Sequence, residues 1–430
     1  MPTDHNPGAL TRFIAASGLA NLGDGIATLA WAWTASLLTR DPLLIALVAA
    51  SLRLPWALFA LPAGVIADRH DRRRLILWMD LLRAVAFALA GLALLAVLPL
   101  PAPPGSGTAS APAYAALLIA ALVVGAAEVF RDTAAQSLLP SLVPSGRLEA
   151  ANGRLWSVEL TGNALVGPPL GALLVGLALP LPFLANAAAY ALAGLIVAGI
   201  ATAGPPAPAA ATNAATSPRA WRPELAEGLA FLRDQPLLRL LAWLTGGWTL
   251  VFQMVIIALI LHAQENLGMT PAAYGLILAA GALGGIAGGL TGEAVVRRLG
   301  AARTAQLTLF ASAPAFVAIA LAPGPWSLAL TLALFEYAGL VWNTVSVATR
   351  QRMIPDRLRG RVNSAYRLLA WGMMPLGLLA SGGIVRLSEG ALGRSAALTL
   401  PFWIAAAGIC ALTLWGWRRL GRGLPGRNPG

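Results

Sequence analysis

The sequence predicts an all-α integral membrane protein, with twelve transmembrane helices in two pseudo-symmetric six-helix bundles. Its 430 residues are 58% hydrophobic and only 11% charged, whereas soluble domains carry about 25% charged residues. So few charges cannot cover the surface of a water-soluble fold of this length. The apolar residues also fall into runs of membrane length, since about 20 helical residues cross the hydrocarbon core. Arginine-rich loops between these runs complete the pattern of a multi-pass membrane protein.

Twelve apolar segments are long enough to be such helices. Pro180-Leu-Pro182 alone separates the fifth from the sixth, and Pro323-Gly-Pro325 separates the ninth from the tenth. Proline ends these helices because it lacks an amide donor. Two spans run close to Pro/Gly-rich loops, so ten or eleven spans is the alternative. The predicted spans are residues 11–38, 43–67, 74–98, 114–138, 155–179, 181–201, 237–262, 272–295, 303–323, 326–349, 364–387 and 395–417.

Arginine sets the orientation of these spans, because it supplies all 30 basic residues of the chain. The loops on one side and the C-terminal tail hold most of them. The opposite loops hold Arg40, Arg394 and, at a helix end, Arg386. By the positive-inside rule both termini are cytoplasmic, which requires an even number of spans. We attribute the absence of lysine to a GC-rich bacterial genome, so the expected location is a bacterial inner membrane.

Composition also limits the classes of function. The net charge of +12 does not indicate a nucleic-acid partner, because the arginines punctuate apolar runs instead of forming a patch. Cys410 is the single cysteine, and His5, His70 and His262 are scattered. The water-facing segments contain no nucleophile–base arrangement, metal-ligand spacing or phosphate-binding loop. We therefore expect no catalytic residues, metal or cofactor, and the alternative of a membrane enzyme or sensor is disfavoured. No cleavable signal peptide is expected, because the first apolar run is too long.

The longest polar break divides the chain into two halves. Residues 202–215 are rich in Ala, Pro and Thr and carry no charge, which is typical of a flexible linker. Residues 221–234 place Leu225, Leu229 and Leu232 on one helical face and charges on the other, which predicts an interfacial helix. A surface connector without a function of its own is the simplest interpretation. The predicted domains are residues 1–201, a six-helix bundle; 202–236, the linker and interfacial helix; and 237–430, a second bundle with a basic cytoplasmic tail.

An internal repeat supports the two halves. Gly64-x-x-x-Asp68-x-x-x-Arg72-Arg73 recurs as Gly289-x-x-x-Glu293-x-x-x-Arg297-Arg298. Each copy lies at the end of the second span of its half. Repeated halves with a site near the midplane are the usual architecture of secondary transporters.

The first copy of the repeat is the most informative segment. Gly64, Asp68, Arg69, Arg72 and Arg73 lie in a short loop between two spans. Arginine costs about 2.5–3.5 kcal/mol at the centre of an inserted helix, so the loop must be a turn at the water–lipid boundary. Its pattern resembles the signature loop between helices two and three of the major facilitator superfamily of transporters. The resemblance implies that Asp68 closes the cytoplasmic side when the cavity faces outward. The alternative is that Asp68 merely offsets loop charge.

Other segments resemble the exporter branch of that superfamily, which includes enterobactin and macrolide efflux proteins. They are Leu54-Pro55-Trp56, Arg131-Asp132-Thr133, Leu139-Pro140, Glu227-Gly228 and Gly360-Arg361-Val-Asn363.

The fifth span resembles the glycine–proline motif of the superfamily's antiporters. It carries Gly162, Gly167, Pro168, Pro169 and Gly171, with an alanine where the family often has a further glycine. Small residues let helices approach closely and prolines bend them. A packing kink without a role in antiport is therefore the alternative.

Charged residues within spans are costly and are functional candidates by default. In the first span polar residues recur at three- and four-residue steps, which predicts one face lining a central cavity. This face consists of Ser17, Asn21, Asp24, Thr28 and Trp31. Asp24 lies near the midplane, and Arg53 of the second span has a comparable depth. We expect either an Asp24–Arg53 ion pair or a proton site at Asp24.

Three further spans carry charges. Glu128, Arg131 and Asp132 of the fourth span lie within one turn, which predicts an internally neutralised cluster whose deepest member, Glu128, titrates. In the tenth span Glu336 has no local partner, and Asn343 lies on the same face. Asp80 and Arg83 of the third span are interpreted as a structural pair, because they are three residues apart. The candidates for proton coupling are Asp24, Glu128 and Glu336.

A cavity for an amphipathic ligand completes the prediction, because aromatic walls suit such molecules. The candidate cavity residues are Asn21, Thr28, Trp31, Arg53, Arg131, Trp248, Gln253, Asn343 and Trp371. We expect proton-coupled export of a small molecule of drug or siderophore type by alternating access, with an importer or lipid transporter of the same fold as the alternative. The expected partners are the lipid bilayer, the substrate and protons, and a monomer is expected to suffice.

Overall fold

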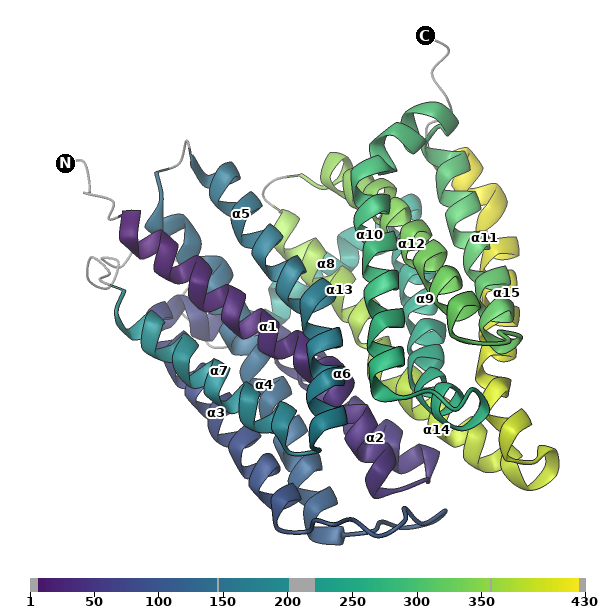
Figure 1. Cartoon of the computed structure of the whole chain (residues 1–430). Helices are drawn as coiled ribbons and strands as arrows, with labels where there is room; N and C mark the ends of the chain where they lie inside the picture. The colour runs from purple at the N-terminus through teal and green to yellow at the C-terminus, as the bar shows by residue number, and fades with distance from the viewer. Residues whose placement is uncertain (1–6, 145–146, 201–220, 356–357, 425–430) are drawn as a thin grey trace. The chain divides into compact units, whose positions relative to one another are not determined.

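The computed structural model describes residues 7–144, 147–200, 221–355 and 358–424. All regular structure in these residues is helical (Figure 1). Eleven helices of the described part are long and apolar enough to cross a membrane. The prediction of an all-α membrane fold is therefore confirmed.

The predicted ninth span is the exception to that hydropathy criterion. It is the helix α11 (Ala301–Ala320), whose first turns carry Arg303, Thr304 and Gln306. The polar groups that point inward are satisfied within the fold. The Thr304 hydroxyl donates to the Gly300 carbonyl at 2.8 Å, and the Gln306 amide donates to the Trp417 carbonyl at 2.7 Å. A twelfth crossing through α11 stays a prediction.

The chain falls into two compact units. Unit 1 comprises Met1–Leu38, Ser51–Pro103 and Thr108–Pro223, and unit 2 comprises Thr39–Ala50, Pro104–Gly107 and Glu224–Gly430. Residues 39–50, which open the second predicted span, thus belong to unit 2. The helices before the linker are α1 (Pro7–Leu38), α2 (Pro42–Arg69), α3 (Arg72–Leu95), α4 (Ala111–Leu142), α5 (Leu148–Leu160), the π-helical η2 (Thr161–Val166), α6 (Gly167–Leu177) and α7 (Leu181–Ala198).

The remaining helices follow the same membrane-length pattern. They are α8 (Trp221–Asp234), α9 (Pro236–Leu261), the π-helical η3 (His262–Asn266), α10 (Pro271–Leu299), α11, α12 (Pro325–Met353), α13 (Arg359–Trp371), α14 (Met373–Leu392) and α15 (Arg394–Gly423). Residues with clear end preferences bound them. Thr270 caps α10 through its hydroxyl, and proline follows at the first helical position. Gly300 and Gly393 end α10 and α14 at φ 80° and 78°, a conformation that glycine adopts without strain.

In unit 1, α1 packs against α7 and against the broken helix formed by α5, η2 and α6. The glycines of the glycine–proline motif make this contact. A Cβ atom at Gly162 would lie 2.9 Å from the Leu22 amide nitrogen, and one at Gly167 would overlap the Gly25 Cα atom. The η2 turn ends just before Pro168 and Pro169, whose missing amides break the regular ladder. The motif therefore forms a close helix contact at a kink, while a role in antiport stays a prediction.

Gly167→Ala is expected to destabilise unit 1, by about 1–3 kcal/mol, because the added methyl would overlap backbone atoms of α1 at Gly25. Gly176→Ala in the same helix is the matched control, since nothing lies within 4 Å of its Cβ position. Alanine there is expected to leave stability unchanged or to raise it, because alanine has the higher helix propensity. Thermal unfolding of both purified variants checks the prediction. Equal midpoints would remove the packing role from the motif.

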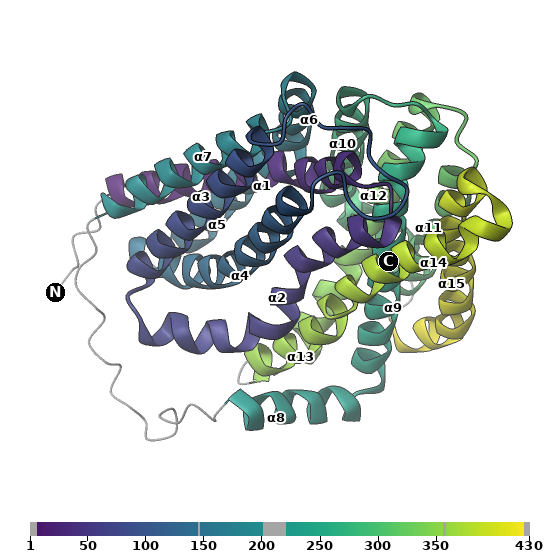
Figure 2. The ribbon, with the colours of Figure 1, turned by 90° about the horizontal axis from the view of Figure 1, so that it is seen from below.

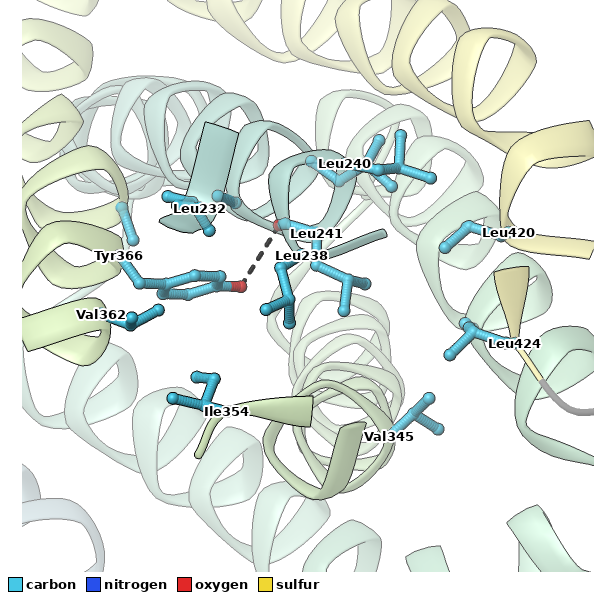
Figure 3. Close-up of a cluster of buried hydrophobic side chains, with 14 of the residues drawn as sticks. Leu232, Leu238, Leu240, Leu241, Val345, Ile354, Val362, Tyr366, Leu420 and Leu424 are labelled. Carbon is cyan, nitrogen blue, oxygen red and sulfur yellow. Dashed lines mark hydrogen bonds between the residues drawn. The ribbon is translucent and has the colours of Figure 1, made fainter. Parts of the chain in front are cut away.

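Unit 2 is built around α9, which packs against α13, α14 and α15. The half of unit 2 that contains the start of α9 holds a cluster of buried apolar side chains, among them Leu238, Leu241 and Val362 (Figure 3). Within this cluster the Tyr366 hydroxyl donates to the Leu241 carbonyl at 3.2 Å. The amphipathic helix α8 joins it through Leu232, which is 3% exposed. Figure 2 shows α8 beside α13, where the Arg361 and Glu227 side chains form an ion pair.

A network of charges joins residues 39–50 to the rest of unit 2. The Arg394 guanidinium pairs with Glu265 at 2.9 Å and donates to the Arg40 carbonyl at 2.8 Å. Arg386 pairs with Asp41 at 3.2 Å. In the sequence these arginines serve only as predicted markers of the outer side, and the structure gives each a carboxylate partner.

Candidate functional site

Unit 1 contains a cluster of charged side chains within its membrane-spanning helices. We refer to it as the charged cluster. It consists of Asp24, Arg53, Asp80, Arg83, Glu128, Arg131, Asp132 and Tyr190. Charges at this depth are costly unless they are paired. Their pairing therefore shows which of them are available for function.

Arg83 holds the centre of the cluster and is fully buried. Its guanidinium forms an ion pair with Asp24 and donates to the Tyr190 hydroxyl at 2.7 Å. The Tyr190 hydroxyl in turn donates to Asp24 at 2.7 Å, and the Arg83 guanidinium lies 4.0 Å from the centre of the Tyr190 ring. Helices α1, α3 and α7 each supply one member. In this closed triad each of the three side chains contacts the other two.

Two predicted pairings are wrong. The partner of Asp24 is Arg83 and not Arg53, and Asp80 pairs with Arg131 of α4 at 3.4 Å instead of with Arg83. A spacing of three residues allows a pair along one helix. However, both α3 side chains here point into the unit, toward carriers of the opposite charge on neighbouring helices. Arg83 and Asp80 are thus part of the site, whereas the sequence predicted only a structural pair near the loop.

Arg131 links two carboxylates and is itself 2% exposed. Besides Asp80, it contacts Asp132 at 3.3 Å, as the internally neutralised cluster predicted. Asp132 keeps 35% of its side chain exposed. Asp80 is fully buried, so Arg131 serves it as a fixed counter-charge, whereas Asp132 remains accessible.

Glu128 occupies a looser environment. Its carboxylate lies 3.8 Å from Arg53, whose side chain is 45% exposed, and it accepts from the Trp56 indole at 3.3 Å. An exposed partner at this distance contributes little. Glu128 therefore has a longer and more exposed ion pair than Asp24, and its predicted role as the titrating member stays a prediction.

The charged cluster has more acids than bases. Its four carboxylates face three guanidinium groups. Glu159 of α5, which the sequence analysis missed, adds a further carboxylate that interacts electrostatically with Asp132 and Arg131. The cluster can therefore take up a positive charge, either as a proton or as a cation.

The predicted polar face of α1 divides into two parts. Asn21, Asp24 and Thr28 keep exposed surface, whereas Trp31 is 3% exposed. The centre of the Trp31 ring lies 5.1 Å from the ring centres of both Phe87 and Phe183, in the core of unit 1. Trp31 is thus placed for packing, and the accessible stripe is limited to the three residues around Asp24.

Among the described residues, Glu336 is the one carboxylate of unit 2 without an ion pair. Glu336 of α12 is partly buried against α10, with its Cγ atom 3.5 Å from the Cβ position of Gly281. Its neighbour Phe335 belongs to an aromatic stack. The centres of the Phe335 and Trp248 rings are 5.8 Å apart, and the Trp248 indole donates to the Ser312 hydroxyl at 3.0 Å.

The other predicted cavity residues of unit 2 lie in different settings. Asn343 is exposed, Gln253 is buried against Gly377, and Trp371 is half-buried. The Arg367 guanidinium lies 5.3 Å from the centre of the Trp371 ring. Trp248 stacks with Phe335 and Glu336 packs against α10, whereas Trp371 stands at the end of α13.

The signature loop is described only in part. The side chain of Asp68 lies outside the described residues, so its predicted role as a gate is untested. Arg72 donates to the Ser137 carbonyl at 3.0 Å, and Arg73 donates to the Ile200 carbonyl at 2.6 Å. These two arginines tie the loop to the ends of α4 and α7, while Arg69 is exposed. Gly64 has nothing within 4 Å of its Cβ position.

Comparisons with known proteins fit this architecture. The Major Facilitator Superfamily model matches residues 13–378. The multidrug efflux pump Tap of Mycolicibacterium fortuitum is 26% identical over 96% of this chain and 97% of its own length. The Tap pump of Mycobacterium tuberculosis H37Rv is 27% identical over 96% and 95%.

Solved structures show the same fold at low identity. A bacterial homologue of the human lysosomal transporter Spinster has a TM-score of 0.76 and 15% identity, over 99% of this chain and all of that one. A variant of the nucleoside transporter NupG has a TM-score of 0.73 and 14% identity, over 96% and 100%. At such identity these structures share the fold and carry no information on substrate.

Proposed function

The chain belongs to the major facilitator superfamily, and from this premise we propose that it exports amphipathic small molecules in exchange for protons, by alternating access. A secondary transporter of small molecules is the general activity of such a chain. The observation that carries the finer proposal is the excess of carboxylates in the charged cluster. A proton and a positively charged substrate compete for these groups, which is the requirement for exchange.

The chemistry of the cluster favours a cationic amphipathic substrate over an anionic one. Four carboxylates against three guanidinium groups repel an acidic siderophore and attract a cation. The stack of Trp248 on Phe252, with ring centres 4.8 Å apart, offers the polarizable surface that such cations prefer. Similarity to multidrug efflux pumps over nearly the whole chain points in the same direction. An importer or a lipid transporter remains the second candidate by fold alone.

The proposal places the chain in a bacterial inner membrane with both termini in the cytoplasm, and a monomer contains all the groups it needs. Asp68 and the arginines of the signature loop act as the cytoplasmic gate. The driving force is sufficient for this work. Because a proton and a monovalent cation exchanged one for one carry no net charge, the pH gradient is the driving force. At about 1.36 kcal/mol per pH unit, one proton supports roughly a tenfold gradient of the cation per unit of pH.

Transport in proteoliposomes tests the proposal. Purified protein is reconstituted with its cytoplasmic face outward and an acidic lumen, and a fluorescent lipophilic cation is added outside. We expect accumulation of the cation that collapses on addition of a protonophore, and none of a matched anionic analogue. Protein-free liposomes measure passive trapping of the cation in the acidic lumen. Equal accumulation with and without the pH gradient would refute proton coupling, and preference for the anion would refute the assigned substrate class.

A further inference from the structure

Unit 2 contains a groove that lies apart from the charged cluster and from Glu336. It has a volume of about 710 Å³ and lies between the start of α9, the end of α12 and the end of α15. Its lining combines basic and aromatic side chains. The residues that matter are Arg239, Arg419, Arg422, Trp243 and Trp415.

The groove is strongly basic and has no acidic residue in its lining. All three arginines are exposed, and within the described residues none of them forms an ion pair. Arg239 donates to the Arg233 carbonyl, which holds its side chain at the mouth of the groove. The nearby Asp234 is occupied by Arg233 at 3.4 Å. Three guanidinium groups therefore line one groove without a carboxylate among its lining residues, which makes the groove attractive to an anion.

The position of the groove in the membrane selects the kind of anion. The arginine-rich ends of α9, α12 and α15 lie at the cytoplasmic boundary by the positive-inside rule. Trp243 and Trp415 are 53% and 44% exposed, and tryptophan at such positions sits at the level of the lipid headgroups. The Arg419 guanidinium lies 4.7 Å from the centre of the Trp415 ring, which orients it toward the groove. A lipid phosphate of the inner leaflet therefore lies at the same level in the membrane as these arginines.

The bottom of the groove is formed by the buried apolar cluster of unit 2. Leu240 lines it, and Leu420, the neighbour of Arg419, is fully buried in the same apolar cluster (Figure 3). The start of α9 also opens into the groove. Gln235 makes no side-chain capping bond and Pro236 follows it, so the positive end of this helix adds to the field of the arginines.

We propose that this groove binds the phosphodiester headgroup of an anionic phospholipid from the cytoplasmic leaflet. Arg419 and Arg422 hold the phosphate, Arg239 closes the mouth, and the acyl chains lie along Trp243 and Trp415. The tryptophans argue for a lipid over free phosphate, since inorganic phosphate gains nothing from apolar side walls. The site is independent of the transported substrate and of proton coupling.

The test compares Arg419→Gln/Arg422→Gln with Arg297→Gln/Arg298→Gln. The control pair is exposed at the end of α10, removes the same charge, and leaves the groove intact. Native mass spectrometry of the full chain with phosphatidylglycerol measures retained lipid. At roughly a fivefold gain per arginine near an anionic surface, the groove variant is expected to bind about thirtyfold more weakly, while the control binds as the wild type does.

Two further arms identify the ligand. Phosphatidylcholine at the same concentration is expected to leave the groove empty, and inorganic phosphate is expected to give no thermal stabilisation. Equal loss of phosphatidylglycerol from both double variants would show attraction by net charge alone and would overturn the site. Stabilisation by inorganic phosphate equal to that by phosphatidylglycerol would overturn the assignment to lipid. None of these readouts depends on transport, so their outcome tests the lipid site independently of the proposed function.

Discussion

Asp24→Asn, made alone, is expected to lower the free energy of unfolding by about 3–5 kcal/mol, because it leaves a buried charge without its counter-charge. The charge is that of Arg83, whose side chain is fully buried and whose ion pair is with Asp24. Asparagine keeps the volume of aspartate, so lost packing does not confound the result. Unfolding by denaturant in mixed micelles measures the change.

A double variant separates electrostatics from local structure. Asp24→Asn/Arg83→Met removes both charges, and replacing a buried ion pair by apolar groups is often neutral or stabilising. We expect it to recover most of the lost stability, although the Tyr190 hydroxyl then loses the bond that it accepts from Arg83. Asp234→Asn is the surface control. Its partner Arg233 is 77% exposed, and an exposed pair contributes at most about 1 kcal/mol. If Asp24→Asn is as stable as the control, the triad does not hold unit 1 together.

The same triad changes the order of the candidates for proton coupling. Protonating Asp24 would remove the counter-charge of Arg83. Each transport cycle would then have to break the buried Asp24–Arg83 ion pair. Glu128 has only a distant, exposed arginine, and Glu336 has no ion-pair partner in the described residues. These two carboxylates can take up a proton without breaking a buried pair. We therefore place them ahead of Asp24.

Sequence alone could predict the segments of this fold but not the pairings inside it. Hydropathy, proline and arginine mark where helices begin and end, and the helices lie at the predicted places. The pairing of Arg131 with Asp132, and the lack of a local partner for Glu336, could be predicted from spacing along one helix, whereas the pairing of Glu128 with Arg53 could not. The rotation of a helix about its axis could not be predicted, because α3 is apolar on most sides. That rotation decides whether Asp80 and Arg83 face opposite charges on neighbouring helices.

One member of the site, Tyr190, left a weak signal in the sequence. Tyr190 and Asn186 are polar residues four apart in an otherwise apolar span, which is the spacing of one helical face. Such a face in a membrane helix indicates a polar neighbour, and Tyr190 does bind Asp24 and Arg83. Glu159 left no comparable signal, because it lies in a segment whose other residues are mixed polar and apolar. Only the packing of α5 near α4 brings it to Asp132.

Glu336→Gln and Glu128→Gln are expected to have the largest effect on transport. If either carboxylate carries the proton, its variant still exchanges labelled for unlabelled substrate but no longer accumulates it against a pH gradient. Accumulation would fall from roughly tenfold per pH unit to about one, since substrate movement is then no longer coupled to the proton. Glutamine preserves the size and most hydrogen bonds of glutamate, including acceptance from the Trp56 indole at Glu128. Both activities are measured in the same proteoliposomes.

The pH profile assigns the proton to one of the two residues. In the wild type, exchange should slow as the coupling carboxylate becomes protonated, whereas in the variant that lacks it exchange should be independent of pH. Glu293→Gln is the matched control, because its side chain is 89% exposed and pairs only with Arg297 of its own helix. It should pump as the wild type does. If both Glu128→Gln and Glu336→Gln also pump normally, neither carries the proton. Asp132 would then be the first candidate, because it is the most exposed carboxylate of the charged cluster and shares its arginine with Asp80.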